Sequence, residues 1–398
     1  MRALVFRNHL GRQAAAKIGG YLTPRAFVAG FAPIRLEDVA DPVPPADGWV
    51  VCDTLVTGIC GSDSKQVFLH GSRSNPLTAL ISFPHVIGHE AVARRADTGA
   101  RVVVNPWLCC VPRGIDPPCD MCAAGEFPHC RNFTEGALSP SLHLGNCSDA
   151  GGTHAERFAA HESCLYEVDD RVDDETAVLA DPVSVSLRQV LRNPPDPTGP
   201  AVVYGCGTLG LCAIALLRHL HPDQTVWAIS HPGRPAELAA RLGAHEVVVA
   251  PGPDEVVAAI ADLSGVTPYE PWSRRPWIRD GPGTCYDTVG SPETVETSMR
   301  FLGAEATLSI SGVESPRRFE WTPLYHKELR VTGSNAFGIE ELGGVRAHAF
   351  EHYFGLVDAG LDLTPIITHR FPLEQWGRAY ATIARRRRTG AVKVLLEP

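Results

Sequence analysis

The sequence predicts an α/β protein in which a mostly β domain precedes a doubly wound parallel sheet. In the first third of the 398-residue chain, turn residues separate short β-like runs at residues 3–6, 49–52 and 100–104. From about residue 200, apolar strands alternate with helical segments. Such alternation is typical of a parallel sheet with helices on its faces.

The alternating region continues to about residue 335, and the tail beyond it returns to mixed structure. The expected strands are short apolar runs bounded by turn residues, at 201–204, 225–230, 245–249, 285–289 and 306–311. The expected helices carry apolar residues at helical spacing, over 209–219, 235–242 and 293–302. Residues 268–283 interrupt this rhythm, which predicts a surface excursion.

The composition, 44% hydrophobic and 20% charged, excludes disordered and fibrous proteins. The net charge of −9 offers no long-range attraction to phosphate backbones, so we expect no nucleic-acid partner. No apolar run reaches the length of a membrane span, and the charged start is not typical of a secretory signal. We therefore expect a cytoplasmic protein with no membrane partner.

Five of the twelve cysteines lie close together, and they predict a structural zinc site. Cys119-x2-Cys122-x7-Cys130 and a cysteine shortly before them supply four thiolates, the usual closed ligand set of structural zinc. We expect Cys110 to be the fourth ligand, with Cys109 as the alternative, in a lobe over about residues 106–132. Buried thiols that bind nothing are the other interpretation. Disulfides are disfavoured because cysteines are sparse in so long a chain.

A glycine-rich loop, GCGTLG at residues 205–210, directly follows an apolar strand and opens an apolar helix. Glycines there permit a tight turn and let a pyrophosphate approach the backbone N–H groups at the helix N-terminus. The loop therefore predicts a dinucleotide site, with a merely structural turn as the alternative. The expected cofactor contacts are Gly205, Gly207, Thr208, Leu209 and Gly210.

The second strand of this unit lacks the acidic residue that usually binds the ribose 2′-hydroxyl of NAD. It ends instead at Ser230 and His231, which leave room for a 2′-phosphate, and Arg234 follows with a charge that could neutralise it. This favours NADP modestly over NAD. The alternative is that Arg234 only caps or solvates the next helix.

Three dispersed residues predict a second metal centre. Taken alone, Cys60, His89 and Asp181 each have an ordinary explanation: a small buried thiol, a core histidine and a turn or cap residue. Taken together, they offer one sulfur, one nitrogen and one oxygen ligand. Three protein ligands and one open position describe a catalytic zinc that polarises a substrate oxygen.

These motifs follow one another in a fixed order: Gly58-Ile59-Cys60-Gly61-Ser62-Asp63, Gly88-His89-Glu90, the clustered cysteines, Gly151-Gly152-Thr153-His154-Ala155-Glu156, the glycine loop, Asp287-Thr288-Val289-Gly290-Ser291 and Lys393-Val394-Leu395-Leu396. In this the chain resembles the zinc-dependent medium-chain dehydrogenase/reductases, the superfamily of alcohol, sorbitol and threonine dehydrogenases. The resemblance implies a groES-like catalytic domain over 1–184, a Rossmann domain over 185–335 and a return to the catalytic domain over 336–398.

The resemblance also implies roles for single residues. Ser62 matches the hydroxyl that relays the substrate proton, and Asp63 matches the carboxylate that orients the zinc-binding histidine. Glu90 matches an acid that can approach the metal. Lys65 stands where many relatives carry the histidine that completes the relay, and Lys393 is expected among the cofactor-binding residues.

The implied activity is hydride transfer between an alcohol or polyol hydroxyl, or its carbonyl, and a nicotinamide cofactor. We expect two zinc ions per chain, a small-molecule substrate and a homodimer or homotetramer. One alternative is a zinc-independent NADPH reductase of enones or quinones from the same superfamily. Another is a zinc-bearing scaffold protein that senses redox state.

Overall fold

The computed structural model describes residues 1–71, 74–314 and 317–398. It consists of two compact units, which we call unit 1 (Met1–Asp181 and Ile367–Pro398) and unit 2 (Pro182–Ile366). The first boundary, at residue 181, lies close to the predicted one at 184. The second lies at 366, whereas the sequence analysis placed the end of the Rossmann domain at 335, so residues 336–366 belong to the compact unit 2.

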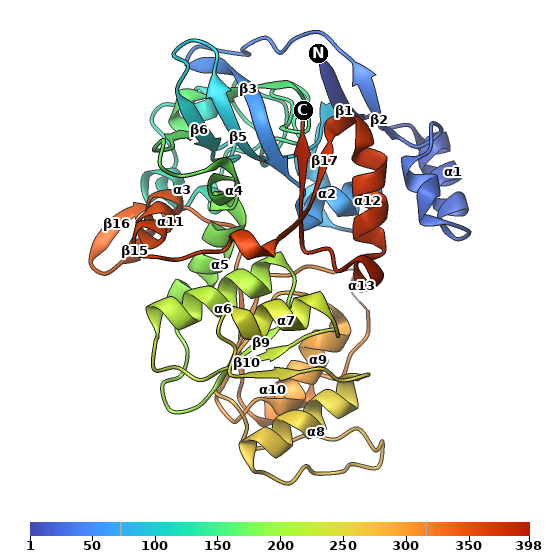
Figure 1. The fold of residues 1–398 in the computed structure, drawn as a ribbon, viewed down its shortest axis with the longest axis vertical. Coiled ribbons are helices and arrows are strands. Elements are labelled where there is room, and N and C mark those ends of the chain that lie inside the picture. Colours follow the sequence, from blue (N-terminus) through green and yellow to red (C-terminus); the bar gives the residue numbers. More distant parts are fainter. Residues whose placement is uncertain (72–73, 315–316) are drawn as a thin grey trace. The chain divides into compact units, whose positions relative to one another are not determined.

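Unit 2 contains a six-stranded parallel sheet with strand order β11-β10-β9-β12-β13-β14. This confirms the predicted parallel α/β architecture (Figure 1). The strands are β9 (Ala201–Tyr204), β10 (Val226–Ile229), β11 (Glu246–Val248), β12 (Thr284–Asp287), β13 (Thr307–Ile310) and β14 (Arg330–Gly333). The chain winds outward from β9 to β11 and then from β12 to β14, so the order reverses between β9 and β12. Ligands of open α/β sheets bind at such a reversal point.

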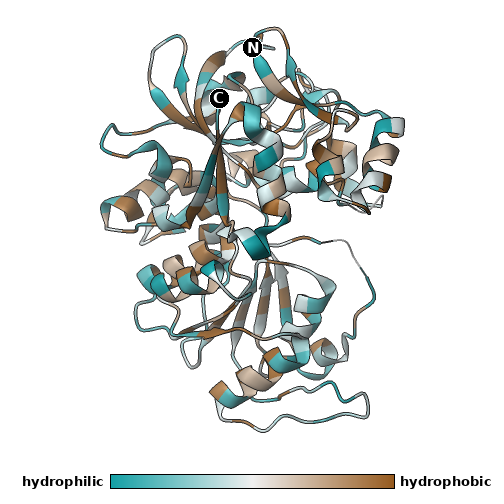
Figure 2. Ribbon diagram, turned by 45° about the vertical axis from the view of Figure 1, so that its right-hand side comes forward, coloured by the Kyte–Doolittle hydropathy of each residue, from teal (hydrophilic) through white to brown (hydrophobic). Residues whose placement is uncertain are grey.

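Unit 2 contains seven α-helices among the described residues. They are α5 (Ala180–Arg192, entering from unit 1), α6 (Thr208–Leu220), α7 (Arg234–Arg241), α8 (Pro253–Ser264), α9 (Pro292–Phe301), α10 (Thr322–His326) and α11 (Ala349–Asp358). Helices α9 and α11 begin with capping boxes. Helix α6 is buried continuously from Gly210 to Leu217, which explains its almost wholly apolar sequence. The central strands β9 and β10 are likewise buried along their whole length, and hydrophobic (brown) stretches occur among the strands of this sheet in Figure 2.

Residues 336–366 contain the hairpin of β15 (Ile339–Leu342) and β16 (Val345–His348). Its Glu340 is buried and pairs with Arg188 and, at 3.2 Å, with Arg192, both on α5. A buried carboxylate requires such partners, so these ion pairs hold the hairpin on unit 2. The polar sequence of the hairpin gives no sign of them.

Unit 1 is mostly β, as predicted. Strands β17-β18-β3-β5-β6-β8 form one sheet, with β7 also paired to β3, and β2-β1-β4 form another. Their bounds are β1 (Arg2–Phe6), β2 (Ile34–Asp38), β3 (Trp49–Gly58), β4 (His85–Val86), β5 (Glu90–Arg95), β6 (Arg101–Val104), β7 (Arg157–His161), β8 (Leu165–Glu167), β17 (Ile367–Pro372) and β18 (Lys393–Glu397). The C-terminal strand β18 pairs antiparallel with β3, which places the end of the chain in unit 1.

Unit 1 also contains helices that the sequence analysis did not assign. They are α1 (Leu10–Gly20), α2 (Gly61–Val67), α3 (Asp120–Ala123), α4 (Asp174–Ala177), α12 (Trp376–Ala384) and α13 (Arg386–Thr389). In the part of the chain that the structure describes, no helix has the length and apolar character needed to cross a membrane.

Candidate active site and metal centres

Cys60 and Asp63 are positioned by the turn from strand β3 into helix α2. The backbone N–H of Cys60 donates to Asp63 Oδ2 at 2.9 Å, which fixes the start of the helix. Gly58, the last residue of β3, leaves room for the Glu90 carboxylate, since a Cβ atom would lie 2.2 Å from Glu90 Oε2. Asp63 is completely buried, so its carboxylate is available only to its neighbours within unit 1.

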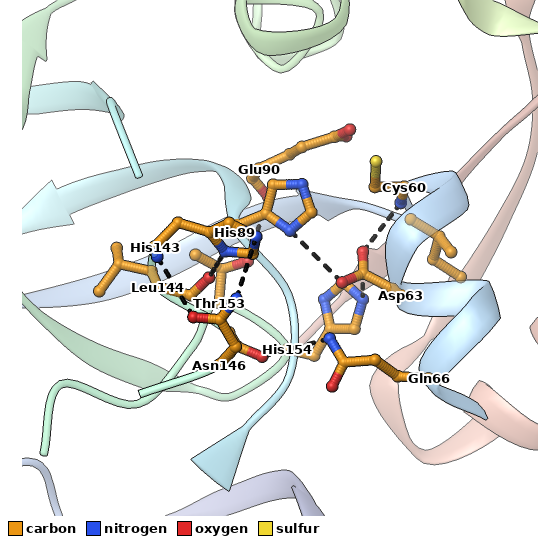
Figure 3. Close-up of polar contacts among 12 residues, drawn as sticks. Cys60, Asp63, Gln66, His89, Glu90, His143, Leu144, Asn146, Thr153 and His154 are labelled. Carbon is orange, nitrogen blue, oxygen red and sulfur yellow. Dashed lines mark hydrogen bonds and ion pairs between the residues drawn. The ribbon is translucent and has the colours of Figure 1, made fainter. Parts of the chain in front are cut away.

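His89 and Glu90 reach the same place from strand β5. The register of β3 and β5 pairs Gly58 with Glu90, so antiparallel pairing brings the two motifs together. The Nδ1 atom of His89 lies 3.4 Å from Asp63 Oδ1 (Figure 3). Its other ring nitrogen faces away from Asp63, on the side of Cys60 and Glu90, and so remains for a metal ion.

Ligand atoms of Cys60, His89 and Glu90 all lie within 4.8 Å of one another. The structure thus brings together a thiol, an imidazole and a carboxyl, a donor set that fits zinc. This differs from the sequence-based expectation, which placed Asp181 in the ligand set and Glu90 beside it. Asp181 is buried at the start of α5 and lies outside this set, in keeping with its short side chain.

The electrostatic environment of this set favours a positive charge. Burial lowers the pKa of His89, but Asp63 and Cys60 more than offset this, so that its pKa lies well above the usual value. Burial alone would raise the pKa of Asp63, yet His89 and His154 lower it overall. An ionised Asp63 behind His89 would stabilise a cation at the ring's free nitrogen. The environment therefore fits a metal ion.

Lys393 differs from its expected role. We expected it among the cofactor-binding residues, but its ammonium is buried in unit 1, where it pairs with Glu90 and lies 3.5 Å from the carbonyl oxygen of Ile59. Burial lowers the pKa of Lys393, but Glu90, Cys60 and Asp181 together outweigh burial, and the pKa is raised. Lys393 therefore compensates a buried carboxylate beside the ligand set.

Asp181 interacts with the residues of this centre, and the expected relay residues Ser62 and Lys65 lie on helix α2, which begins directly after Cys60. Burial raises the pKa of Asp181 to about 7, and Glu90 contributes further to the increase. Ser62 Oγ is buried and, among the described residues, has no hydrogen-bond partner. A substrate hydroxyl could supply that missing partner. Lys65 is half-buried in the last turn of α2.

Sequence reasoning missed two histidines at this centre. The ring of His143 lies 4.7 Å from that of His89, centroid to centroid, and its nitrogens face Leu144 O and, at 3.3 Å, Asn146 Nδ2. His154 lies 3.0 Å from Thr57 Oγ1 and 3.7 Å from Asp63 Oδ2. His154 lies within a motif we had recognised, whereas His143 lies in an irregular loop that gave no signal.

The cysteine lobe also brings its predicted ligands together. The sulfur atoms of Cys110, Cys119, Cys122 and Cys130 all lie within 4.8 Å of one another. Backbone N–H groups donate to two of these sulfur atoms: that of Cys119 to Cys110 Sγ at 3.3 Å, and that of Asn132 to Cys130 Sγ at 3.4 Å. Such hydrogen bonds stabilise thiolates, so the set fits a closed tetrahedral zinc site.

Replacing Cys110 by serine should remove one zinc ion per chain and destabilise the lobe, because the closed set loses a thiolate. The matched variant Cys109→Ser should keep that ion, since Cys109 lies outside the set. Elemental analysis of both variants is the measurement. Loss of metal from the Cys109 variant alone would reverse our assignment of the fourth ligand.

In unit 2, the glycine loop between β9 and α6 is tightly packed on one side and open on the other. Gly205 has φ +96°, and a Cβ atom at Gly210 would lie 1.7 Å from Gly205 O, so both positions require glycine. A Cβ atom at Gly207, the N-cap of α6, would meet nothing within 4 Å. The open side at the start of a helix fits a bound pyrophosphate.

The residues after β10 also lie where the sequence placed them. Ser230 is buried and donates from Oγ to His231 O at 2.9 Å. His231 and Arg234 are exposed, and Arg234 is the first residue of α7. Helix α7 is thus preceded by a polar turn that carries no carboxylate.

Comparisons with known proteins agree with this picture. Residues 46–170 match the alcohol dehydrogenase GroES-like domain, and residues 208–350 match the zinc-binding dehydrogenase family. The chain is 26% identical to L-threonine 3-dehydrogenase of Saccharopolyspora erythraea, covering 92% of this chain and 95% of that protein. It is 21% identical to sorbitol dehydrogenase of Bacillus subtilis, covering 86% of this chain and 88% of that protein.

Solved structures show the same fold. The alcohol dehydrogenase of the archaeon Aeropyrum pernix superposes with a TM-score of 0.72 at 21% identity, covering all of both chains. A dehydrogenase of Escherichia coli CFT073 in complex with NADH superposes with a TM-score of 0.71 at 20% identity, covering 100% of this chain and 99% of that chain. The groES-like and Rossmann architecture is thereby confirmed.

The matched families and the curated relatives are dehydrogenases, which favours an enzyme over a scaffold protein. Zinc and a nicotinamide cofactor belong to that assignment, with a small alcohol or polyol as substrate. The chain belongs to the zinc-dependent medium-chain alcohol and polyol dehydrogenases.

Proposed function

We propose that this enzyme oxidises a small polyol or amino alcohol with NADP, at a zinc ion held by Cys60, His89 and a carboxylate. The observation that carries the proposal is the convergence of Cys60, His89 and Glu90 within 4.8 Å. When bound, zinc supplies Lewis-acid polarisation of the substrate oxygen. A second zinc ion, held by the four lobe cysteines, is structural, so the chain holds two.

In this proposal the surrounding residues orient groups and move the proton. Asp63 holds the ring of His89 in place from behind. Ser62 Oγ, buried and without a partner among the described residues, takes up the proton of the substrate hydroxyl as it hands on its own, and Lys65, three residues later in the same helix, is the next group in this proposed relay. A nicotinamide cofactor held at the glycine loop of residues 205–210 would supply the hydride acceptor for this oxidation.

Two carboxyl groups could complete the metal site. Glu90 belongs to the group of close ligand atoms, whereas Asp181 interacts electrostatically with it from nearby. Because only Glu90 of these two lies within 4.8 Å of the ligand atoms of Cys60 and His89, we propose Glu90 as the third protein ligand and Asp181 as the acid beside it. This reverses the two roles that the resemblance implied.

The names of the relatives guide the choice of substrate. L-threonine 3-dehydrogenase, L-arabinitol 4-dehydrogenase and sorbitol dehydrogenase are curated relatives, and a 2R,3R-butanediol dehydrogenase shares the fold. Threonine carries an amino group on the carbon next to the one whose hydroxyl is oxidised. Arabinitol, sorbitol and butanediol carry a second hydroxyl there. We therefore propose a substrate that carries a hydroxyl or amino group beside the oxidised carbon.

We propose a cytoplasmic homodimer or homotetramer. Support for the compartment comes from the twelve cysteines, none of which forms a disulfide. Support for the oligomer comes from the family resemblance, and sedimentation velocity would measure it.

Turnover of polyols and amino alcohols should be faster with NADP than with NAD, because Arg234 can pair with the 2′-phosphate. Replacing Arg234 by glutamine should raise KM for NADP about tenfold, the loss of one charge-assisted hydrogen bond, and leave KM for NAD unchanged. Arg241→Gln, at the other end of α7, is the matched control. Steady-state absorbance assays measure both constants.

Two results would contradict this proposal. If none of these substrates is oxidised with either cofactor, the assignment of the reaction is wrong. If Arg234→Gln affects NADP and NAD equally, the cofactor preference is wrong while the reaction stands.

A further inference from the structure

Helix α1 packs on unit 1 through its smallest residues. Ala16 is fully buried, and a Cβ atom at Gly19 would lie 2.7 Å from Ala26 Cβ. At Gly20, a Cβ atom would lie 2.4 Å from the ring of Phe27. Ala26 and Phe27 belong to the following 3₁₀ helix, Pro24–Val28, so the absence of side chains lets the two helices touch closely.

The large apolar side chains of this segment point outward instead. Leu10, Ile18, Tyr21 and Leu22 are 79%, 68%, 91% and 89% exposed. Leu10, Ile18 and Tyr21 recur at helical spacing, so they form one stripe along the helix. A surface helix normally buries such a stripe and exposes its small and polar residues. Helix α1 has the opposite arrangement. Exposed apolar patches of this kind mark interaction surfaces.

The charged side chains of the chain segment that contains this stripe are all positive. The first 36 residues contain no aspartate or glutamate, and their cationic residues are Arg2, Arg7, Arg12, Lys17, Arg25 and Arg35. The whole chain has a net charge of −9, so the segment is charged oppositely to the rest of the protein.

Three of these cations have no acidic partner in the described parts of the chain: Arg12, which donates to the carbonyl oxygens of Gly30 and Ala32, and Lys17 and Arg25. Arg7 and Arg35 pair with Glu37, and Arg2 pairs with Glu156. Lys17 and Arg25 are exposed, and neither has an acidic partner within ion-pair distance in the described parts of the chain. Both therefore offer their charge to an external partner, beside the apolar stripe.

We infer that this surface, which we call the α1 patch (Leu10, Lys17, Ile18, Tyr21, Leu22 and Arg25), binds the surface of an anionic lipid bilayer. A short helix with exposed aliphatic and aromatic side chains and adjacent cations is typical of helices that lie in a membrane interface. Two copies of this chain joined through the same patch would place like charges together, so the charge disfavours that occupant. The patch lies at the edge of unit 1 (Figure 1) and outside the matched family models, the first of which begins at residue 46.

The test uses the full-length enzyme and vesicles of phosphatidylcholine, with or without phosphatidylserine, in a co-sedimentation assay. The patch variants are Ile18→Ser with Leu22→Ser, and Lys17→Glu with Arg25→Glu. The matched controls are Val43→Ser with Val345→Ser, two other exposed apolar residues, and Arg241→Glu with Arg279→Glu, two exposed cations of unit 2. Dehydrogenase activity in all variants confirms that they are folded.

We expect the wild type to bind the phosphatidylserine vesicles, more weakly at high salt, and to ignore the neutral ones. Each patch variant should lower the partition coefficient at least about tenfold, because each removes either the buried apolar area or the electrostatic attraction. Both controls should bind like the wild type. No binding by the wild type, equal binding by the patch variants, or a patch variant that instead changes the sedimentation coefficient of the free enzyme would overturn the inference.

Discussion

Replacing Cys60 by serine is expected to reduce kcat by at least about three orders of magnitude, a loss of roughly 4 kcal/mol of transition-state stabilisation. The thiol of Cys60 is one of three clustered ligands, and a serine hydroxyl stays protonated and binds zinc poorly. The fold should persist, because Cys60 lies at a helix N-cap and its backbone N–H still donates to Asp63. Stopped-flow or steady-state assays measure kcat, and circular dichroism checks that the fold persists.

A matched control for this variant is Cys52→Ser, on strand β3, which ends two residues before Cys60. Burial raises the pKa of Cys52 to about 12, so this residue is a neutral thiol in the core and not a ligand. Its variant should retain turnover per folded molecule. Turnover that is unchanged in Cys60→Ser would show that Cys60 has no part in the reaction.

The second large effect is expected at the buried pair of Glu90 and Lys393. Replacing Lys393 by methionine leaves the carboxylate of Glu90 buried without its cation, and breaking such a pair typically costs about 3–5 kcal/mol. The free energy of unfolding in urea should fall by that amount in the metal-free enzyme. The double variant Glu90→Gln with Lys393→Met should recover much of it, since no charge remains buried.

The exposed variant Lys17→Met serves as the control and should change stability by no more than about 0.5 kcal/mol. If Lys393→Met is no less stable than the double variant, Lys393 does not compensate Glu90, and our explanation of its position fails.

The sequence predicted the parallel sheet of unit 2 because its signals are local. Strand β9 occupies the predicted residues, 201–204, and α6 differs from the prediction by one residue at each end. An apolar run that ends in a glycine turn defines its own limits. The boundary at residue 366 was missed because it depends on Glu340 meeting Arg188 and Arg192, which lie far away in the sequence.

The distinction between local sequence signals and contacts of residues far apart in the sequence also applies to the site. Motifs indicated Cys60, His89 and the lobe cysteines, because each ligand type occurs there at a recognisable spacing. The relative positions of Glu90 and Asp181 follow from the β3–β5 register and the length of one side chain, which no motif encodes. The position of Lys393 follows from the pairing of the last strand with β3. Helix α1 escaped notice because its apolar residues are exposed, in contrast to the usual pattern.

Zinc content per chain, measured by elemental analysis of the wild type and of Cys60→Ser and Cys110→Ser, tests the central claim most directly. Our account predicts about two zinc ions in the wild type and about one in each variant, because the two ligand sets are separate and each needs its cysteine. A wild type with a single zinc ion that survives in Cys60→Ser would contradict it and would favour a zinc-independent reductase.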